Sequence, residues 1–399
     1  MSLRKLFEGV RVLDLSRMLA GPYGSMLLAD MGAEVIKIED PDGGDPMRTM
    51  GPPFLGDGRS AYFLSINRNK KSVALDMTRP EGRDCFHDLV RASDVVWENF
   101  RPGIMKRLGC EPERLRALNP RLIVCSISAY GQDGPYSEWP AFDLALQAMG
   151  GAMSITGEEG SSPVRMGLPM GDLAGGMFGA FAVAGALFRR EVTGDGGVID
   201  LSLLDAQASL LTYIAQYFWT DGRVPGPMGS GHTSVVPYGA LQTSDGHLIV
   251  AVFEKFWRGF CRALDRGDLE ADARFATNQA RVAHRAQLMP IIEEAVRRRP
   301  TAEWLAALQR EGVPVAPIQT VDRVLADPQL EHRRMITTVS YPPHGRVPTL
   351  GTPIKVDGAM ELEPAPPPGL GEHTDDVLRE LLKYPEDRIV ALRASGVVK

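Results

Sequence analysis

A single aspartate, Asp172, stands between glycines in the segment GLPMGDLAGG at residues 167 to 176, directly before the uncharged stretch from Leu173 to Phe188. An Asp at the start of an apolar helix most often caps its N-terminus. The position also suits chemistry, because free N–H groups and the helix dipole stabilise a carboxylate, which we expect to stay ionised at neutral pH. Asp172 is therefore predicted to be a helix cap or a carboxylate nucleophile, and the two roles are compatible.

Motifs of the commonest other chemistries do not occur in the sequence. It contains no GxxxxGK[ST], GxSxG or HExxH pattern, and its first glycine-rich turn, LAGPYGSM, does not spell GxGxxG. The cysteines are far apart and do not have metal-ligand spacing: Cys85, Cys110, Cys125 and Cys261. This pattern is typical of isolated thiols in a reducing compartment. No metal site is predicted, and carboxylates are the candidates for covalent or acid–base chemistry.

Charge and hydropathy exclude two classes of partner. The formal net charge is −6 and no basic tract is present, which disfavours nucleic-acid binding. The stretch from Leu173 to Phe188 is short for a bilayer span and ends in Arg189 and Arg190, so we expect a buried helix rather than a membrane helix. The first residues lack the apolar core of a signal peptide. We expect a cytoplasmic protein.

The elements that must position Asp172 alternate between strand-like and helix-like runs. The strand-like runs are apolar and rich in β-branched residues: VRVLDLS, EVIKIED, KSVALDM, DVVWENF and RLIVCSIS. This alternation predicts an α/β fold with a doubly wound, mainly parallel, Rossmann-like sheet. Such sheets bind ligands at the carboxyl ends of their strands.

Two Pro/Gly-rich segments, at 221–238 and 340–358, interrupt this pattern. Between them a hairpin-like SDGHLIVAVF and two helical stretches predict a smaller α/β domain. We therefore predict three parts: the large domain at 1–222, the small domain with its linkers at 223–328, and a return crossing with the C-terminal part of the large domain at 329–399.

Six segments, taken in order, resemble the class III CoA-transferase family, which includes formyl-CoA and carnitine CoA-transferases and the α-methylacyl-CoA racemases. They are LAGPYGSMLLADMGAEVIKIE, NRNKKSVALDM, ENFRPGIMKRLG, YGQDGPYSEWPAFDLALQAMGG, GLPMGDLAGG and LGEHTDDVL. The resemblance extends from about Phe7 to the last helix. It implies two domains per chain and a homodimer of interlocked chains.

By this resemblance, Asp172 matches the catalytic aspartate of the family. It would attack an acyl-CoA thioester to form an aspartyl anhydride, and CoA would then form an aspartyl thioester that a carboxylic acid acceptor resolves. The CoA thioester is a substrate, and no prosthetic group is implied. Backbone amides near Asp172, or the glycine-rich segment GPMGSG at 226–231, could stabilise the oxyanions, although that segment also reads as a plain linker.

The resemblance also implies positions that bind CoA: Ala20, Leu75, Asn99, Phe100 and Arg107. Arg101 is added to these CoA-binding positions for its nearby positive charge. Further cations nearby suit phosphates, or form a solvated basic face: Arg68, Lys70, Lys71 and Lys106. Leu19 and Asp40 stand where formyl-CoA transferase has a glutamine and an arginine, which weakens an assignment to formyl-CoA and oxalate.

The residues Ala141, Phe142 and Asp143 bear on the reaction. A racemase of this family uses a His followed by Asp here, and Phe142 cannot carry a proton. Asp143 would tune or orient the site, or cap a turn or helix, and both Phe142 and Asp143 are counted with the CoA-binding positions. We predict a CoA-transferase acting on succinyl-CoA or another dicarboxylyl-CoA and a small carboxylic acid. A racemase, a non-catalytic acyl-CoA-binding protein and a Rossmann oxidoreductase are the alternatives.

Overall fold

The computed structural model describes residues 2–358 and 364–399, which form two compact units. Unit 1 comprises Met1–Ala152, Met166–Gln216 and Pro328–Lys399, and unit 2 comprises Met153–Arg165 and Tyr217–Asp327. The stretch Met153–Arg165 thus packs with unit 2, whereas the sequence analysis placed it in the large domain. Its partners there are segments far along the chain, which local sequence patterns do not reveal.

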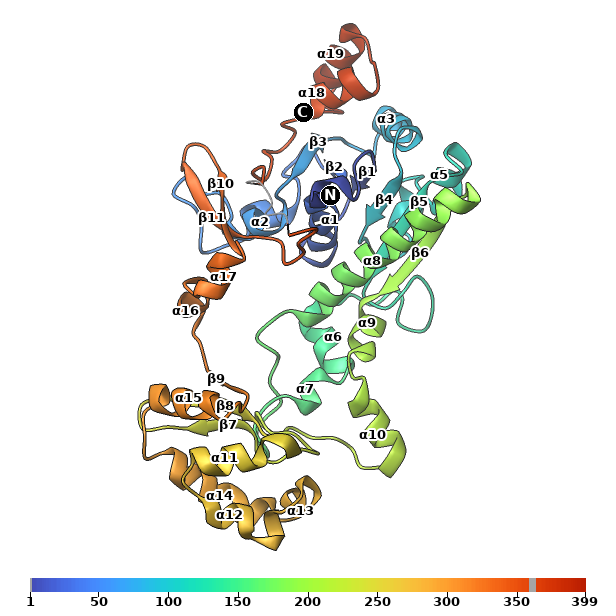
Figure 1. Cartoon of the computed structure of the whole chain (residues 1–399). Helices are drawn as coiled ribbons and strands as arrows, with labels where there is room; N and C mark the ends of the chain where they lie inside the picture. Colours follow the sequence, from blue (N-terminus) through green and yellow to red (C-terminus); the bar gives the residue numbers. More distant parts are fainter. Residues whose placement is uncertain (1, 359–363) are drawn as a thin grey trace. The chain divides into compact units, whose positions relative to one another are not determined.

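Unit 1 is built on a six-stranded sheet with the order β3-β2-β1-β4-β5-β6 (Figure 1). All neighbouring strands are parallel. The strands are β1 (Arg11–Asp14), β2 (Glu34–Glu39), β3 (Lys70–Ala74), β4 (Val95–Glu98), β5 (Ile123–Ser128) and β6 (Gly197–Ser202). This is the strand order of a doubly wound Rossmann sheet, and the predicted α/β class is confirmed.

Successive residues of each strand enter different cores. Leu13 and Val96 pack against α3 and the C-terminal helices, while Val12 and Val95 pack against α1 and α8. The helices of unit 1, with α7 and α10 crossing into unit 2, are α1 (Ala20–Asp30), α2 (Ala61–Ile66), α3 (Pro80–Arg91), α4 (Ile104–Arg107), α5 (Pro112–Leu118), α6 (Asp143–Met149), α7 (Ala152–Ile155), α8 (Met170–Thr193), α9 (Leu203–Ser209), α10 (Tyr213–Asp221), α17 (Pro328–His332), α18 (Thr374–Asp376) and α19 (Glu386–Ala394). Short turns of helix occur at η1 (Leu3–Lys5), η2 (Pro46–Thr49) and η5 (Val377–Leu381).

Helix α8 lies against α1 with their backbones in contact. A Cβ atom at Gly176 would stand 2.6 Å from the carbonyl oxygen of Ala20, and one at Gly24 would stand 2.6 Å from the carbonyl oxygen of Gly176. Only glycine permits this approach. The glycines that follow Asp172 therefore fix where the start of α8 lies relative to α1.

The other face of α8 is apolar but open to solvent in the single chain. Phe181 and Phe188 are 78% and 76% exposed. Among the described residues, α8 is also the one helix long and apolar enough to cross a membrane, a test that core helices of soluble proteins pass as well. The expectation of a buried helix thus holds for one face only.

The C-terminal residues cover the edge of the sheet at β3. The amide of His373 donates to the carbonyl of Ser72 at 2.9 Å, and the amide of Ala74 donates to Thr374 Oγ1 at 3.1 Å. A hairpin of β10 (Ile336–Ser340) and β11 (Arg346–Leu350) precedes this segment. An edge strand with free backbone groups would invite pairing with other chains, and this segment prevents it.

Unit 2 holds an antiparallel sheet of β7 (Tyr238–Gln242), β8 (His247–Ala251) and β9 (Val315–Pro317). Its helices are α11 (Trp257–Ala263), α12 (Gly267–Ala271), α13 (Asn278–Ala283), α14 (Arg285–Val296), α15 (Thr301–Arg310) and α16 (Val321–Leu325), with short turns at η3 (Glu254–Phe256) and η4 (Ala273–Phe275). It has its own core around Trp257, Phe260 and Trp304. The segment at 226–231 belongs to this unit, and the amide of Gly229 donates to the carbonyl of Gly157 at 2.7 Å.

Candidate active site

Asp172 is the third residue of α8, not its cap. The N-cap position is Pro169, whose side chain makes no capping bond. The cap is instead supplied by Asp143, the first residue of α6. Asp143 Oδ1 accepts hydrogen bonds from the amides of Gly171, at 2.8 Å, and Asp172, at 3.3 Å. The side chain of Asp172 is thus not needed to cap the helix.

Gln147 fixes both Asp143 and the segment before α8. Its Nε2 donates to Asp143 Oδ2 at 2.6 Å, and its Oε1 accepts from the amide of Met166 at 2.8 Å. Gln147 is fully buried. The buried amide lies one helical turn after Asp143 in α6, so a single short helix sets the geometry of the first turn of α8.

The half-buried carboxyl of Asp172 is hard to ionise. Burial, and then the neighbouring charge of Asp143, raise the pKa of Asp172 to about 7. Our expectation that α8 keeps Asp172 ionised at neutral pH is therefore wrong. The N–H groups that would have stabilised its charge are bonded to Asp143, which adds a like charge as well.

The same bonding affects the expected oxyanion donors. The amides of Gly171 and Asp172 donate to Asp143, and that of Leu173 donates to the carbonyl of Pro169 at 3.0 Å. These amides are occupied, so they do not form an oxyanion hole in this conformation, contrary to the expectation from sequence.

Tyr62, in α2, is a neighbour of the carboxylate pair that the sequence analysis missed. Burial raises the pKa of its hydroxyl, and the charges of Asp172 and Asp143 raise it further. The phenol is thus kept protonated and lies within electrostatic range of Asp172. A tyrosine in an ordinary amphipathic segment carries no sequence signal of such a role.

An open pocket of about 550 Å³ lies at the carboxyl ends of β1 and β4. It is lined by Arg17, Met18, Asn99, Phe100, Arg101, Ile104, Arg107 and Leu108. The structure therefore brings together Asn99, Phe100 and Arg107, which the resemblance assigned to CoA, with Arg101, which was predicted for its charge. Arg17 was missed, although it directly follows the first strand; its guanidinium lies 5.3 Å from the centre of the Phe100 ring.

This pocket and Asp172 are linked through α1. The turn containing Arg17 and Met18 leads directly into α1 at Ala20. The carbonyl of Ala20 is the group against which Gly176 packs, one helical turn beyond Asp172. The pocket and the carboxylate therefore stand at the same edge of unit 1.

Other predicted positions do not line the pocket. Ala20 and Leu75 are 3% and 2% exposed, so their side chains lie inside the protein. Phe142 is 72% exposed and precedes Asp143 at the start of α6. It is next to the carboxylate pair along the chain, but its ring lies open to solvent.

Two of the cations suggested for phosphate binding are structural. Arg68 is buried in an ion pair with Asp30, and Lys70 is buried with its Nζ 3.0 Å from Asp14 Oδ2. Lys71 pairs with Glu34. The charges of Arg68 and Lys70 are neutralised inside the protein, so the proposal that they hold phosphates is wrong.

Comparisons with known proteins show the family of the chain. The model of the family described as CoA-transferase family III matches residues 7–374. The succinyl-CoA:glutarate CoA-transferase of Homo sapiens is 38% identical over 99% of this chain and 90% of its own. The succinate–glutarate CoA-transferase of Agrobacterium fabrum is 39% identical over 94% of this chain and 95% of its own.

Among solved structures, a CAIB/BAIF family protein from Brucella suis aligns with a TM-score of 0.82 and 40% identity, covering 94% of this chain and 98% of that one. The matches by sequence and by structure extend over both units. The resemblance inferred from six segments is thereby confirmed, and the chain is an enzyme that belongs to CoA-transferase family III.

Proposed function

We propose that this enzyme transfers CoA from succinyl-CoA, or a related dicarboxylyl-CoA, to a dicarboxylic acid, with Asp172 as the nucleophile. The observation that carries the proposal is the placement of Asp172, half-buried, in a capped helix start at the same edge of unit 1 as the cationic pocket. The donor and acceptor follow from the relatives, whose names pair succinyl-CoA or succinate with glutarate. Five-carbon and four-carbon dicarboxylates are therefore the first acceptors to test.

In the proposed sequence, a carboxylate oxygen of Asp172 attacks the thioester carbonyl carbon and the C–S bond breaks. A mixed anhydride and a CoA thiolate result. The thiolate attacks the carbonyl carbon of Asp172, which releases the donor carboxylate and leaves an aspartyl-CoA thioester. The acceptor carboxylate then repeats the two steps in reverse order. In each step one acyl bond forms as another breaks, and over the whole sequence one thioester is exchanged for another with no net proton consumed.

The raised pKa of Asp172 suits this role. A carboxylate that the protein stabilises strongly is a weak nucleophile, and Asp172 has lost the helix N–H groups to Asp143. About half of the molecules carry the charged form near pH 7. The site thus presents a carboxylate that gains by becoming an uncharged ester-like group, as it does on forming the anhydride.

The pocket supplies what an acyl-CoA requires. Arg17, Arg101 and Arg107 suit the phosphates of the nucleotide, since guanidinium groups bind phosphate oxygens in pairs. Phe100 and Ile104 offer apolar surface for the adenine or the pantetheine arm. We assign the nucleotide end of the substrate to this pocket and the thioester end to Asp172.

We also propose that the enzyme is a homodimer, with the open face of α8 as part of the contact. The exposed apolar residues Met177, Phe181, Phe188 and Val192 recur at spacings of four and seven, so they form one stripe along the helix. A stripe of this size on a single chain is typical of a surface that another protein covers. The implied interlocking of two chains is consistent with the discontinuous unit 1.

The test of the reaction is covalent trapping. The protein is incubated briefly with succinyl-CoA, with and without glutarate, then treated with hydroxylamine and mapped by mass spectrometry. We expect a hydroxamate on the peptide containing Asp172 and the appearance of glutaryl-CoA. The Asp172→Ala variant should lose both. Asp205 is also the third residue of its helix, α9, so Asp205→Ala is a matched control that should keep both.

A protein that forms no adduct and no new thioester, although it binds CoA, would contradict the transferase assignment. Exchange of the α-proton of a 2-methylacyl-CoA with deuterated water, measured in parallel, would then support the racemase alternative. The absence of both reactions would leave the acyl-CoA-binding alternative.

A further inference from the structure

The turn from Ser16 to Met18 leaves β1, and its residues Arg17 and Met18 line the pocket. Ser16 is bonded to Asp14 of β1, and the rest of the turn is held by side chains from other parts of unit 1. Asn99 binds its centre: Asn99 Oδ1 accepts from the amide of Arg17, and Asn99 Nδ2 donates to the carbonyl of Arg17, both at 2.8 Å. Such reciprocal pairing fixes the turn against the segment that follows β4. The ends of the turn are held differently.

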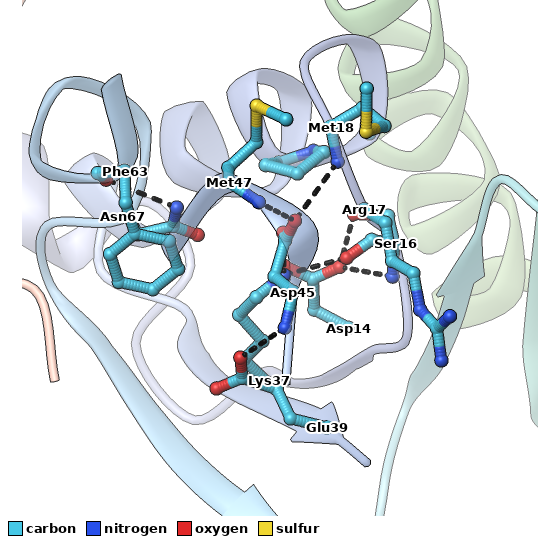
Figure 2. Close-up of polar contacts among 12 residues, drawn as sticks. Asp14, Ser16, Arg17, Met18, Lys37, Glu39, Asp45, Met47, Phe63 and Asn67 are labelled. Atoms are coloured by element: carbon cyan, nitrogen blue, oxygen red, sulfur yellow. Dashed lines mark hydrogen bonds and ion pairs between the residues drawn. The ribbon is translucent and has the colours of Figure 1, made fainter. Parts of the chain in front are cut away.

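Buried charges bind the two ends of the turn (Figure 2). Lys37 Nζ donates to the carbonyl of Ser16 at 2.6 Å, and Asp45 Oδ1 accepts from the amide of Met18 at 3.3 Å. Lys37 and Asp45 also pair with each other, with 3.0 Å between Nζ and Oδ2. They are 0% and 1% exposed, so the pair lies wholly inside the protein beneath the turn.

Asp45 is itself held firmly. Its backbone amide donates to Glu39 Oε1 at 3.0 Å, and its Oδ1 accepts a second bond from the amide of Met47 at 3.0 Å. Glu39, at the end of β2, is fixed in turn by Arg48. The position of Asp45 Oδ1 is thus determined by β2 and η2, independently of the turn that it binds.

The bond to Asp45 stabilises Met18 in an unfavourable backbone conformation. Met18 has φ +70°, in the left-handed region that residues with a side chain rarely adopt. Such a residue persists only where its surroundings determine it. The bond from the amide of Met18 to Asp45 is the side-chain contact that holds this residue of the turn.

We propose that Asp45 is a positioning residue of this enzyme: together with Lys37 it holds the Ser16–Met18 turn in the shape that binds acyl-CoA before the ligand arrives. The inference rests on the proposed function of the pocket. A preformed turn spares the ligand the entropic cost of ordering it. Buried ion pairs rarely add stability over apolar residues of the same size. Stability therefore does not account for the Lys37–Asp45 pair, whereas holding the turn directly above it does.

The test compares variants of Asp45 with a control carboxylate. Asp45→Ala removes the acceptor, whereas Asp45→Asn keeps an oxygen for the amides and removes the charge. Asp30→Asn is the control, because Asp30 is also buried in unit 1, in its ion pair with Arg68, and does not contact the turn. Each variant is measured for binding of free CoA by calorimetry, for KM and kcat with succinyl-CoA, and for amide hydrogen exchange at residues 16–18.

We expect Asp45→Ala to weaken CoA binding about tenfold or more, since it removes hydrogen bonds to a charged acceptor. KM should rise while kcat changes little, and exchange at Met18 should accelerate. Asp45→Asn should recover part of each effect, and Asp30→Asn should lower thermal stability without raising KM. If Asp45→Ala does not fold, Asp45→Asn against Asp30→Asn decides the question by the same measurements.

Wild-type CoA affinity and unchanged exchange in the Asp45 variants would overturn the inference. A wrong assignment of the pocket to CoA would give a different result, because Arg107→Ala would then bind CoA as well as the wild type does. In that case only hydrogen exchange at the amide of Met18 tests whether Asp45 holds the turn. If this exchange were equally fast in Asp45→Asn and Asp30→Asn, the role of Asp45 in holding the turn would be overturned too.

Discussion

At the scale of single residues, Asp172 is a carboxylate that its surroundings make hard to ionise, and we propose that it is the nucleophile. Most aspartates near a helix start gain stability from the free N–H groups there. Asp143 takes those groups and faces Asp172 with a like charge, so the pKa of Asp172 rises to about 7. This arrangement should lower stability and, under the proposed mechanism, should make the activity depend on pH.

Activity should depend on the ionisation of Asp172. Because only the carboxylate attacks, kcat/KM for succinyl-CoA should rise with pH through a midpoint of about 7 and then level off. Asp143→Asn removes the like charge, so its midpoint should move to lower pH. A profile flat from pH 5 to 8 in the wild type, measured with a pH-independent coupling assay, would contradict the assignment.

The folding stability should fall as pH rises, whereas the activity should rise. The pKa of Asp172 rises from an ordinary value of 3.8 to about 7 on folding, so the native state binds more protons than the unfolded state between these pH values. This group therefore lowers stability as pH rises from about 4 to 7. Asp172→Asn should raise the melting temperature by a few degrees at pH 8 and by much less at pH 4. An equal shift at both pH values would show that ionisation is not the cause.

At the scale of elements, α8 carries Asp172 and its glycines decide where it stands. Gly176→Ala should destabilise the protein by a few kcal/mol, because its Cβ would meet the carbonyl of Ala20 and force α1 away. Gly185→Ala, in the same helix with no atom within 4 Å of its Cβ, should instead stabilise by up to about 1 kcal/mol. Denaturant titration of the two variants checks the contrast.

The sequence predicted helix α8 and the residues of the pocket, but not the contacts that α8 makes. The apolar run after Asp172 indicated the helix, but the close approach of its glycines to Ala20 was not predicted. Asn99, Phe100, Arg101 and Arg107 lie in one short segment, so a local motif was enough to place them together.

Burial depends on contacts between distant segments and could not be predicted in the same way. Arg68 and Lys70 look like Arg101 in the sequence, yet their partners Asp30 and Asp14 lie far back along the chain. The capping of α8 by Asp143 and the proximity of Tyr62 to Asp172 also depend on contacts between segments that are distant in the sequence. The predicted ionisation of Asp172 was wrong because it considered α8 alone.

At the scale of the whole molecule, the apolar stripe of α8 predicts association. Light scattering should give a mass of about twice the 43.5 kDa chain, unchanged on dilution if the chains interlock. Replacing both Phe181 and Phe188 by Ser should reduce assembly or produce soluble aggregates. A wild-type monomer with full activity would refute the homodimer and leave the stripe without an explanation.

The cover over β3 has a consequence for how the protein is made. Hydrogen bonds between β3 and the C-terminal segment join residues about 300 positions apart, as Ser72 to His373 and Ala74 to Thr374 do. At about 5 to 20 residues per second, a ribosome needs tens of seconds to produce that distance. During this interval unit 2, with its own core, can fold, whereas the first sheet waits with one edge unprotected. Errors in the biogenesis of this enzyme should therefore begin at β3, in chains whose synthesis is slow or interrupted.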